Sequence, residues 1–217
     1  MDYYYTLLTI YMVFSFATCV VATYCLPKYK HTPLILAPVI LWLSFVTESS
    51  GILYSEYIRI ANGWIFNIYG FLFFLLFFIM LHNFIKAKRS QTITKAIIIS
   101  VLTARSIRFF MLDSFNDRMI FIDALELVAL IIIIAIFLRE FLKSNESFNF
   151  KHHPEFFFIG GYLIFHLVYT PLNVAYDMKL RLFSGTFYVF LKSIQFYVLL
   201  AMNGFFIFGF LWTKKME

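Results

Sequence analysis

Seven long apolar runs, separated only by short polar breaks, constrain the fold of this chain more than any other feature of its sequence. A helix needs about 20 apolar residues to cross the hydrocarbon core of a bilayer, and each run has roughly that length. Of the 217 residues 62% are hydrophobic and only 14% are charged, against about 25% charged in a soluble domain. The sequence therefore predicts an all-α polytopic membrane protein, a single domain over 1–217. Its seven transmembrane helices are expected at 5–26, 32–54, 63–85, 96–112, 119–142, 154–176 and 185–212.

The lysine and arginine residues of the breaks predict the orientation of these helices. With seven crossings, one side of the membrane carries eleven basic residues and the other side carries four. Because cytoplasmic loops are enriched in Lys and Arg, the side with eleven is expected to be cytoplasmic. The N-terminus then lies outside and the C-terminus in the cytoplasm, and the first run is expected to be a permanent span rather than a signal peptide.

The fourth run is the least regular of the seven, because it is short and contains Arg105 and Arg108. If it does not cross, the later breaks exchange sides, and the basic residues divide eleven against six. The sharper asymmetry of the seven-span arrangement favours a crossing at the fourth run.

Several charged and polar residues fall inside the runs, where a charge costs at least about 2.5–3.5 kcal/mol on insertion scales. In the seven-span arrangement these residues all lie in the outer half of the membrane. Arg105 and Arg108 are three residues apart and share a helix face, and Asp123 and Glu126 share a face of the next helix. We therefore expect a polar cluster, which comprises Glu48, Asn67, Arg105, Arg108, Asp123, Glu126 and Lys192.

Two interpretations of this cluster remain open at the level of sequence. It could be a charge-neutral network that locks the helices together, or an outward-facing polar cavity that senses or conducts a small solute or ion. No GxSxG, HExxH, P-loop or dinucleotide-binding motif is present, so an enzyme is not expected. His152 and His153 have no Cys or acid at metal-ligand spacing, so no metal site and no cofactor are predicted.

A second group of charges lies in the break after the third run, on the expected cytoplasmic side. These residues are Lys86, Lys88, Arg89 and Lys95. They predict contact with anionic lipid headgroups, or with a cytoplasmic protein or RNA–protein partner. The sequence allows a homo-oligomer and does not fix its size.

Four segments carry a resemblance to a known group of proteins: ESSG at 48–51, WIFNIY at 64–69, FN at 115–116 and PEFFFIGGYLIF at 154–165. They resemble signatures of small multi-pass membrane proteins common in Bacteroidota genomes. The resemblance implies a location in the bacterial inner membrane. In size and multi-pass character the chain is also loosely similar to membrane accessory proteins of type VI-B CRISPR loci. That similarity implies an alternative function, an antiviral accessory that oligomerises and perturbs the inner membrane or modulates an RNA-guided nuclease.

Overall fold

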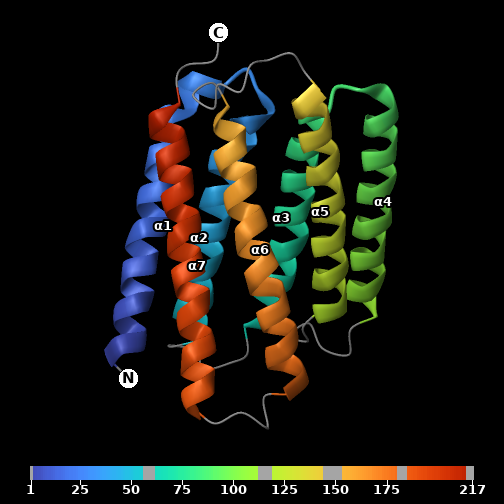
Figure 1. Cartoon of the computed structure of the whole chain (residues 1–217). Coiled ribbons are helices and arrows are strands. Elements are labelled where there is room, and N and C mark those ends of the chain that lie inside the picture. The colour runs from blue at the N-terminus through green and yellow to red at the C-terminus, as the bar shows by residue number, and fades with distance from the viewer. Residues whose placement is uncertain (1, 56–61, 112–118, 144–152, 180–184, 214–217) are drawn as a thin grey trace. The chain divides into compact units, whose positions relative to one another are not determined.

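Seven α-helices account for most of the residues that the structure, a computed structural model, describes (Figure 1). The described part of the chain comprises all residues except 1, 56–61, 112–118, 144–152, 180–184 and 214–217. No β-strand occurs in that part. A short 3₁₀ helix, Pro33–Leu36, precedes the second α-helix. The α-helices are α1 (Asp2–Tyr29), α2 (Ala37–Leu53), α3 (Gly63–Phe84), α4 (Lys88–Phe110), α5 (Ile120–Lys143), α6 (Pro154–Lys179) and α7 (Gly185–Trp212).

The helices coincide with the predicted runs within a few residues, except at the start of α4. All the described helices other than α4, six in number when Pro33–Leu36 is counted with α2, are long and apolar enough to cross a membrane. The all-α class is therefore confirmed, and the length and composition of these helices support a membrane protein. The prediction that the fourth helix begins at residue 96 is wrong, because α4 begins at Lys88. The segment predicted as a basic loop is thus largely the first turns of a helix.

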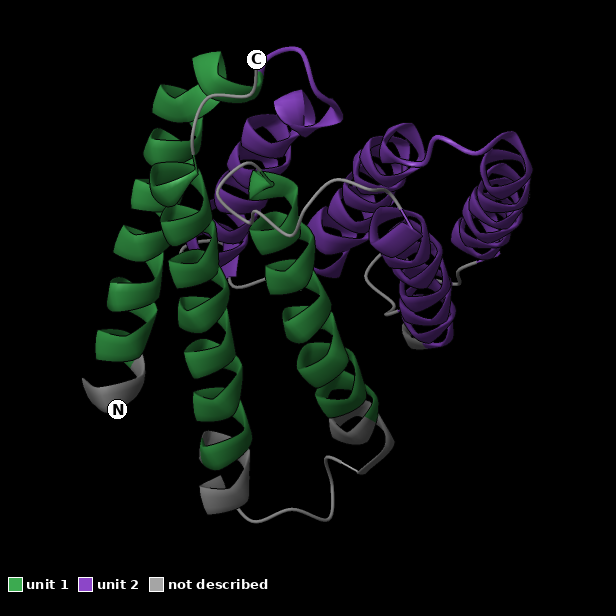
Figure 2. Ribbon diagram, turned by 45° about the horizontal axis from the view of Figure 1, so that its top comes forward, with its two compact units in different colours: residues 1–29, 149–217 green, residues 30–148 purple. Residues whose placement is uncertain are grey.

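The chain divides into two compact units, which are described separately (Figure 2). Unit 1 comprises residues 1–29 and 149–217 and holds α1, α6 and α7. Unit 2 comprises residues 30–148 and holds α2 to α5. The grouping does not test the expectation of a single domain over 1–217, which stays a prediction.

In unit 2, α3 is the central helix, and it packs against α2, α4 and α5. Two hydrogen bonds join α2 and α3, one between two side chains and one from a side chain to the backbone. The hydroxyl groups of Ser44 and Tyr69 lie 2.8 Å apart, and Asn62 Nδ2 donates to the Gly51 carbonyl at 2.9 Å. Phenylalanine rings fill the interior of the unit, where Phe77 and its neighbours on α3 are fully buried.

Polar contacts tie α4 to its neighbours at both of its ends. At its start, Glu140 near the end of α5 accepts hydrogen bonds from the backbone N–H groups of Lys86 and Ala87, at 3.0 and 3.2 Å. At its other end, Arg105 contacts the first turns of α3 and α5. Helix α4 therefore runs antiparallel to α3 and α5 over nearly their whole length.

In unit 1, glycine residues of α6 and α7 make room for aromatic rings of the facing helix. A Cβ atom on Gly161 of α6 would lie 2.6 Å from the Phe206 ring of α7. A Cβ atom on Gly209 of α7 would lie 2.4 Å from Cβ of Phe157 on α6. Each helix thus has a glycine that packs against a phenylalanine of the other helix, and these two contacts fix the register of the pair.

Lys28, near the end of α1, binds the carboxyl end of α7. Its Nζ lies 3.1, 3.4 and 3.2 Å from the carbonyl oxygens of Phe210, Leu211 and Thr213. The last carbonyl groups of a helix have no hydrogen-bond partner within the helix. A lysine near them also interacts favourably with the partial negative charge at that end of the helix dipole. Because the two helices end side by side and pack along their length, α1 and α7 run parallel.

We expect Lys28→Met to lower the free energy of unfolding by about 1–2 kcal/mol, because two carbonyl groups of α7 and that of Thr213 directly after it lose a charged donor. The measurement is SDS-induced unfolding of the protein in bicelles. Lys30→Met is the matched control, since Lys30 is exposed, and it should change the stability by less than about 0.5 kcal/mol. Equal effects of the two substitutions would show that the Lys28 contact adds nothing to stability.

Candidate functional site

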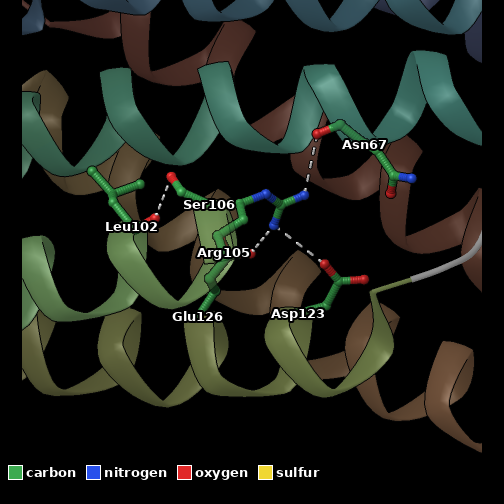
Figure 3. A network of polar contacts seen from close by, with 6 residues as sticks. All are labelled: Asn67, Leu102, Arg105, Ser106, Asp123 and Glu126. Carbon is green, nitrogen blue, oxygen red and sulfur yellow. Dashed lines mark hydrogen bonds and ion pairs between the residues drawn. The ribbon is translucent and has the colours of Figure 1, made fainter. Parts of the chain in front are cut away.

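Arg105 is the centre of a buried polar cluster at one end of unit 2 (Figure 3). The residue is only 2% exposed. Its Nη1 lies 2.5 Å from Oε2 of Glu126 and 3.4 Å from Oδ1 of Asp123. Its Nη2 lies 3.5 Å from the backbone carbonyl oxygen of Asn67. One guanidinium group therefore links α4 to both α3 and α5.

The helix arrangement explains why these residues meet. Asp123 and Glu126 lie within the first turns of α5, three residues apart, so they share a helix face. Asn67 lies in the second turn of α3, and Arg105 lies near the end of α4. Because α4 is antiparallel to α3 and α5, its end reaches the level of their starts. The structure thus brings together four of the seven residues predicted for the cluster.

Gly70 provides the space that the guanidinium group occupies. A Cβ atom at Gly70 would lie 2.1 Å from Nη2 and 2.9 Å from Cζ of Arg105, closer than atoms can approach. Phe74, one turn further along α3, places its ring centroid 6.0 Å from Cζ of Arg105, within range of a cation–π contact. The sequence analysis did not identify these two residues. The spacing 67, 70 and 74 on one helix face was the available signal.

The ionic contacts of Arg105 join one base with two acids. The Glu126 residue is fully buried, whereas the Asp123 side chain keeps 45% of its surface exposed. Among the residues that the structure describes, none forms a hydrogen bond with Oε1 of Glu126 or with Nε of Arg105. These contacts therefore leave one buried acceptor on Glu126 and one buried donor on Arg105 without a hydrogen bond to the described residues.

The other three residues predicted for the cluster lie elsewhere. Arg108 is exposed, and its Nη1 donates to the Met111 carbonyl at 3.3 Å. A contact between Arg108 and the two acids is not seen in the described part of the chain. Glu48 lies partly buried on α2, and Lys192 lies on α7 in unit 1. Of the two arginines, Arg105 contacts the two acids, whereas Arg108 contacts the Met111 carbonyl.

The second predicted group, Lys86, Lys88, Arg89 and Lys95, lies at the opposite end of α4 from Arg105. Their side chains are all exposed. Lys88, Arg89 and Lys95 belong to α4 itself, and Lys86 lies in the turn before it. They form a basic surface, and a partner for this surface stays a prediction.

A cavity of about 260 Å³ lies between α3 and α4, next to the cluster. Arg105 and Asn67 contribute polar atoms to its wall, and the remaining wall is mostly apolar. The other lining residues are Ile68, Phe71 and Leu72 of α3, and Ser106, Phe109 and Phe110 of α4. A polar cavity in this region was one of the two interpretations left open by the sequence, and the apolar wall was not predicted.

No group of three or more His, Cys, Asp or Glu side chains that could hold a metal ion occurs in the described part of the chain. Comparison of the sequence with protein-family models and with curated proteins, and of the structure with solved structures, finds no match. The resemblance to Bacteroidota membrane proteins and to CRISPR accessory proteins therefore receives no support from these comparisons. The antiviral function that it implies stays a prediction.

Proposed function

We propose that this chain is a non-enzymatic integral membrane protein that binds a proton at Glu126 and senses or conducts it. The observation that carries the proposal is the Glu126 carboxyl group, which is fully buried and whose Oε1 forms no hydrogen bond with the residues that the structure describes. A buried carboxylate oxygen without a hydrogen bond is costly in a membrane-embedded protein, and binding of a proton to that oxygen removes the cost.

A proton fits this site better than a metal ion does. Calcium takes six to eight oxygen ligands, and other hard cations similarly need a shell of oxygen atoms. A proton needs a single oxygen atom, and Oε1 of the fully buried Glu126 has no hydrogen-bond partner among the described residues. Intramembrane Asp and Glu side chains are also the common members of proton relays.

The difference in exposure between the two acids gives the site a direction. Asp123 lies at the start of α5 with its side chain about half exposed, and Glu126 lies one turn deeper with no exposed surface. Arg105 contacts both carboxyl groups. Both contacts are to Nη1, so the two carboxyl groups lie on the same side of the guanidinium group. We therefore expect a proton to enter at Asp123 and to pass from there to Glu126.

The helix contacts support a crossing by α4, and with it the seven-span arrangement. Helices α3 and α5 end at the same level, because Glu140 of α5 contacts the turn after α3. They also begin at the same level, where Arg105 contacts both. Helix α4 connects the end of α3 to the start of α5. These two points lie at opposite ends of the α3–α5 pair, so α4 must span the same distance as α3 and α5. If those two helices cross the membrane, α4 crosses it too.

Unit 1 supports the same conclusion independently. The Lys28 side chain contacts the carboxyl end of α7, which favours an arrangement with the carboxyl ends of α1 and α7 on one side of the membrane. Six helices lie between these two points, from α2 to α7, and an even number of crossings returns the chain to the same side. Without a crossing by α4 the number is odd. We therefore propose seven spans in the bacterial inner membrane, with the N-terminus outside and the Arg105 cluster in the outer half.

The test is proton entry into liposomes that contain the purified protein and a pH-sensitive dye, driven by a potassium diffusion potential. We expect the wild-type protein to acidify the interior and Glu126→Gln to abolish the signal. Asp123→Asn should slow entry without abolishing it, because Asp123 lies on the route but is not the binding group. Glu155→Gln is the matched control, since Glu155 is a buried carboxyl group of unit 1 that is paired with His153.

A protein that senses protons without conducting them would give no flux. Infrared difference spectra of wild type and Glu126→Gln then decide the matter, because a protonated carboxyl group has its own C=O stretching band. A band lost only in Glu126→Gln supports proton binding. Absence of both the flux and the band would rule the proposal out.

A further inference from the structure

The basic surface at the start of α4 continues onto the end of α5. Arg139 and Lys143 are exposed residues of α5, and they lie four residues apart on one helix face. Glu140, next to Arg139, binds the turn before α4, so the end of α5 and the start of α4 lie at the same end of unit 2 (Figure 1). The extended basic surface comprises Lys86, Lys88, Arg89, Lys95, Arg139 and Lys143.

The charge of this surface is not balanced by the described residues around it. Glu140 is the only acidic residue that the structure describes at this end of unit 2, and its carboxylate accepts hydrogen bonds from two backbone N–H groups. The first turn of α4 contains no acidic residue. The surface therefore has a large excess of positive charge, which an anionic partner would neutralise.

The depth of Lys95 favours a lipid as this partner. An α-helix rises about 1.5 Å per residue, so about 20 residues span a hydrocarbon core of about 30 Å. Phe110, at the end of α4, is an exposed apolar residue, and 20 residues counted back from it reach about residue 91. Where α4 crosses the membrane, Lys95 thus lies inside the hydrocarbon boundary. A soluble protein or a nucleic acid does not reach that depth, whereas a lipid lies along the helix there.

Lys88 and Lys95 are placed to bind one headgroup together. They are seven residues apart, which is two helical turns, so they share a face of α4. The Cβ atoms of a helix tilt toward its start, so the Lys95 side chain extends toward Lys88 and the headgroup level. Ile99, one turn deeper on the same face, is 55% exposed. The face therefore presents two ammonium groups followed by apolar surface, in the same order as the headgroup and acyl chains of a phospholipid.

We infer that the face of α4 formed by Lys88, Lys95 and Ile99 binds a phospholipid with a net negative headgroup. The lipid phosphate lies between the two ammonium groups, and an acyl chain lies along the helix against Ile99. The inference rests on the proposed crossing by α4. It does not depend on the proton site, because the two lysines lie in the half of α4 away from Arg105.

The experiment measures lipid binding to the full-length protein in detergent by native mass spectrometry. We expect phosphatidylglycerol, which is anionic, to bind at least about tenfold more tightly than phosphatidylcholine, which has no net charge, when both carry the same acyl chains. Equal binding of the two lipids would overturn the inference.

Variants of α4 locate the binding. Lys95→Gln should weaken phosphatidylglycerol binding about fivefold, the usual contribution of one basic residue near a membrane surface. Lys95→Arg keeps the charge and should bind within about twofold of wild type. Arg108→Gln is the matched control, because Arg108 is an exposed basic residue at the other end of α4, and its removal should change binding less than about twofold. Equal losses in Lys95→Gln and Arg108→Gln would overturn the inference.

Soluble competitors distinguish a lipid from other anions. Glycerophosphoglycerol has the headgroup of phosphatidylglycerol without its acyl chains, and we expect it to compete at least about a hundredfold more weakly than the lipid. A uridine oligonucleotide at the same phosphate concentration should not displace the lipid. Efficient displacement by either competitor would overturn the inference, in favour of a site for a free phosphate compound or for RNA.

The inference and the proton proposal fail separately. Glu126→Gln should abolish proton binding and leave phosphatidylglycerol binding within about twofold of wild type, because Glu126 lies near the start of α5 and this surface lies at its end. A protein that binds protons but shows no preference for phosphatidylglycerol would contradict the inference alone.

Discussion

Replacing Arg105 by alanine is expected to lower the free energy of unfolding by about 3–5 kcal/mol, the usual cost of removing one partner of a buried ion pair. Glu126 is fully buried and would lose the guanidinium group that lies 2.5 Å from it. Arg105→Ala also removes the link from α4 to the Asn67 carbonyl of α3. SDS-induced unfolding in bicelles measures the change, and Arg108→Ala is the matched control, because Arg108 is exposed one turn away on the same helix.

A double variant separates the structural contribution of this cluster from its function. Arg105→Met with Glu126→Leu removes both buried charges and replaces them with apolar side chains of similar size. Such replacements are often neutral or stabilising, so the double variant should regain most of the stability that Arg105→Ala loses. It should nevertheless fail to bind a proton. A loss below about 1 kcal/mol in Arg105→Ala itself would mean that the buried ion pair has little structural importance.

Gly70→Ala is expected to lower the free energy of unfolding by about 2–4 kcal/mol, because the added methyl group occupies the position of the Arg105 guanidinium group. The alanine Cβ would lie 2.1 Å from Nη2. Gly160→Ala and Gly204→Ala are matched controls, since both glycines are in helices and a Cβ atom there meets nothing within 4 Å. Alanine in a helix is favoured over glycine by roughly 0.5–1 kcal/mol, so the controls should be neutral or slightly stabilising.

The two large effects should not add. Once Arg105 is replaced by alanine, the space beside Gly70 is empty, and Gly70→Ala should then cost little. Unfolding of the wild type, both single variants and the double variant gives the coupling energy between the two positions. Additive losses would show that the methyl group disturbs something other than Arg105.

The sequence was sufficient to locate the helices, because short polar breaks separate the apolar runs and all but the fourth are as long as a membrane-spanning helix. It was not sufficient to locate the start of α4. Hydropathy assigns Lys88, Arg89 and Lys95 to a loop, although basic side chains are compatible with helical backbone. What begins the helix at Lys88 is a tertiary contact, the Glu140 carboxylate on the N–H groups of the preceding turn. Such a contact from a distant helix leaves no local pattern.

The site was only partly predictable for a similar reason. The spacing of Asp123 and Glu126 indicated a shared face, and a short connection to the helix of Arg105 made their contact expected. The same spacing argument also placed Arg108 in the cluster, whereas the helix ends two residues later, at Phe110, and Arg108 binds the carbonyl of Met111 instead. The role of Gly70 depends on which residue of another helix approaches it, which no property of Gly70 itself reveals.

Three of the four segments singled out in the sequence contribute to close helix packing, and the fourth, FN at 115–116, lies outside the described residues. In the ESSG segment, Gly51 packs closely against the ring of Phe66, which belongs to the WIFNIY segment. A Cβ atom at Gly51 would lie 2.8 Å from that ring. In the PEFFFIGGYLIF segment, Gly161 does the same for Phe206. Helices that pack closely in membranes favour small residues opposite large ones. These segments thus indicate a manner of helix packing rather than a chemistry.

Lys28 has a consequence for the time course of synthesis. Lys28 belongs to α1, which is synthesised first, whereas the carbonyl groups that it binds lie at the end of α7, which is synthesised last. Residues 30–148, which form unit 2, lie between them in the sequence. At roughly 5–20 residues per second, a ribosome needs on the order of ten to forty seconds to pass from the end of α1 to the end of α7. During that interval unit 2 is completed, whereas α1 remains without its partner helices of unit 1. A ribosome that stalls before α6 therefore leaves unit 2 complete and α1 without α6 and α7.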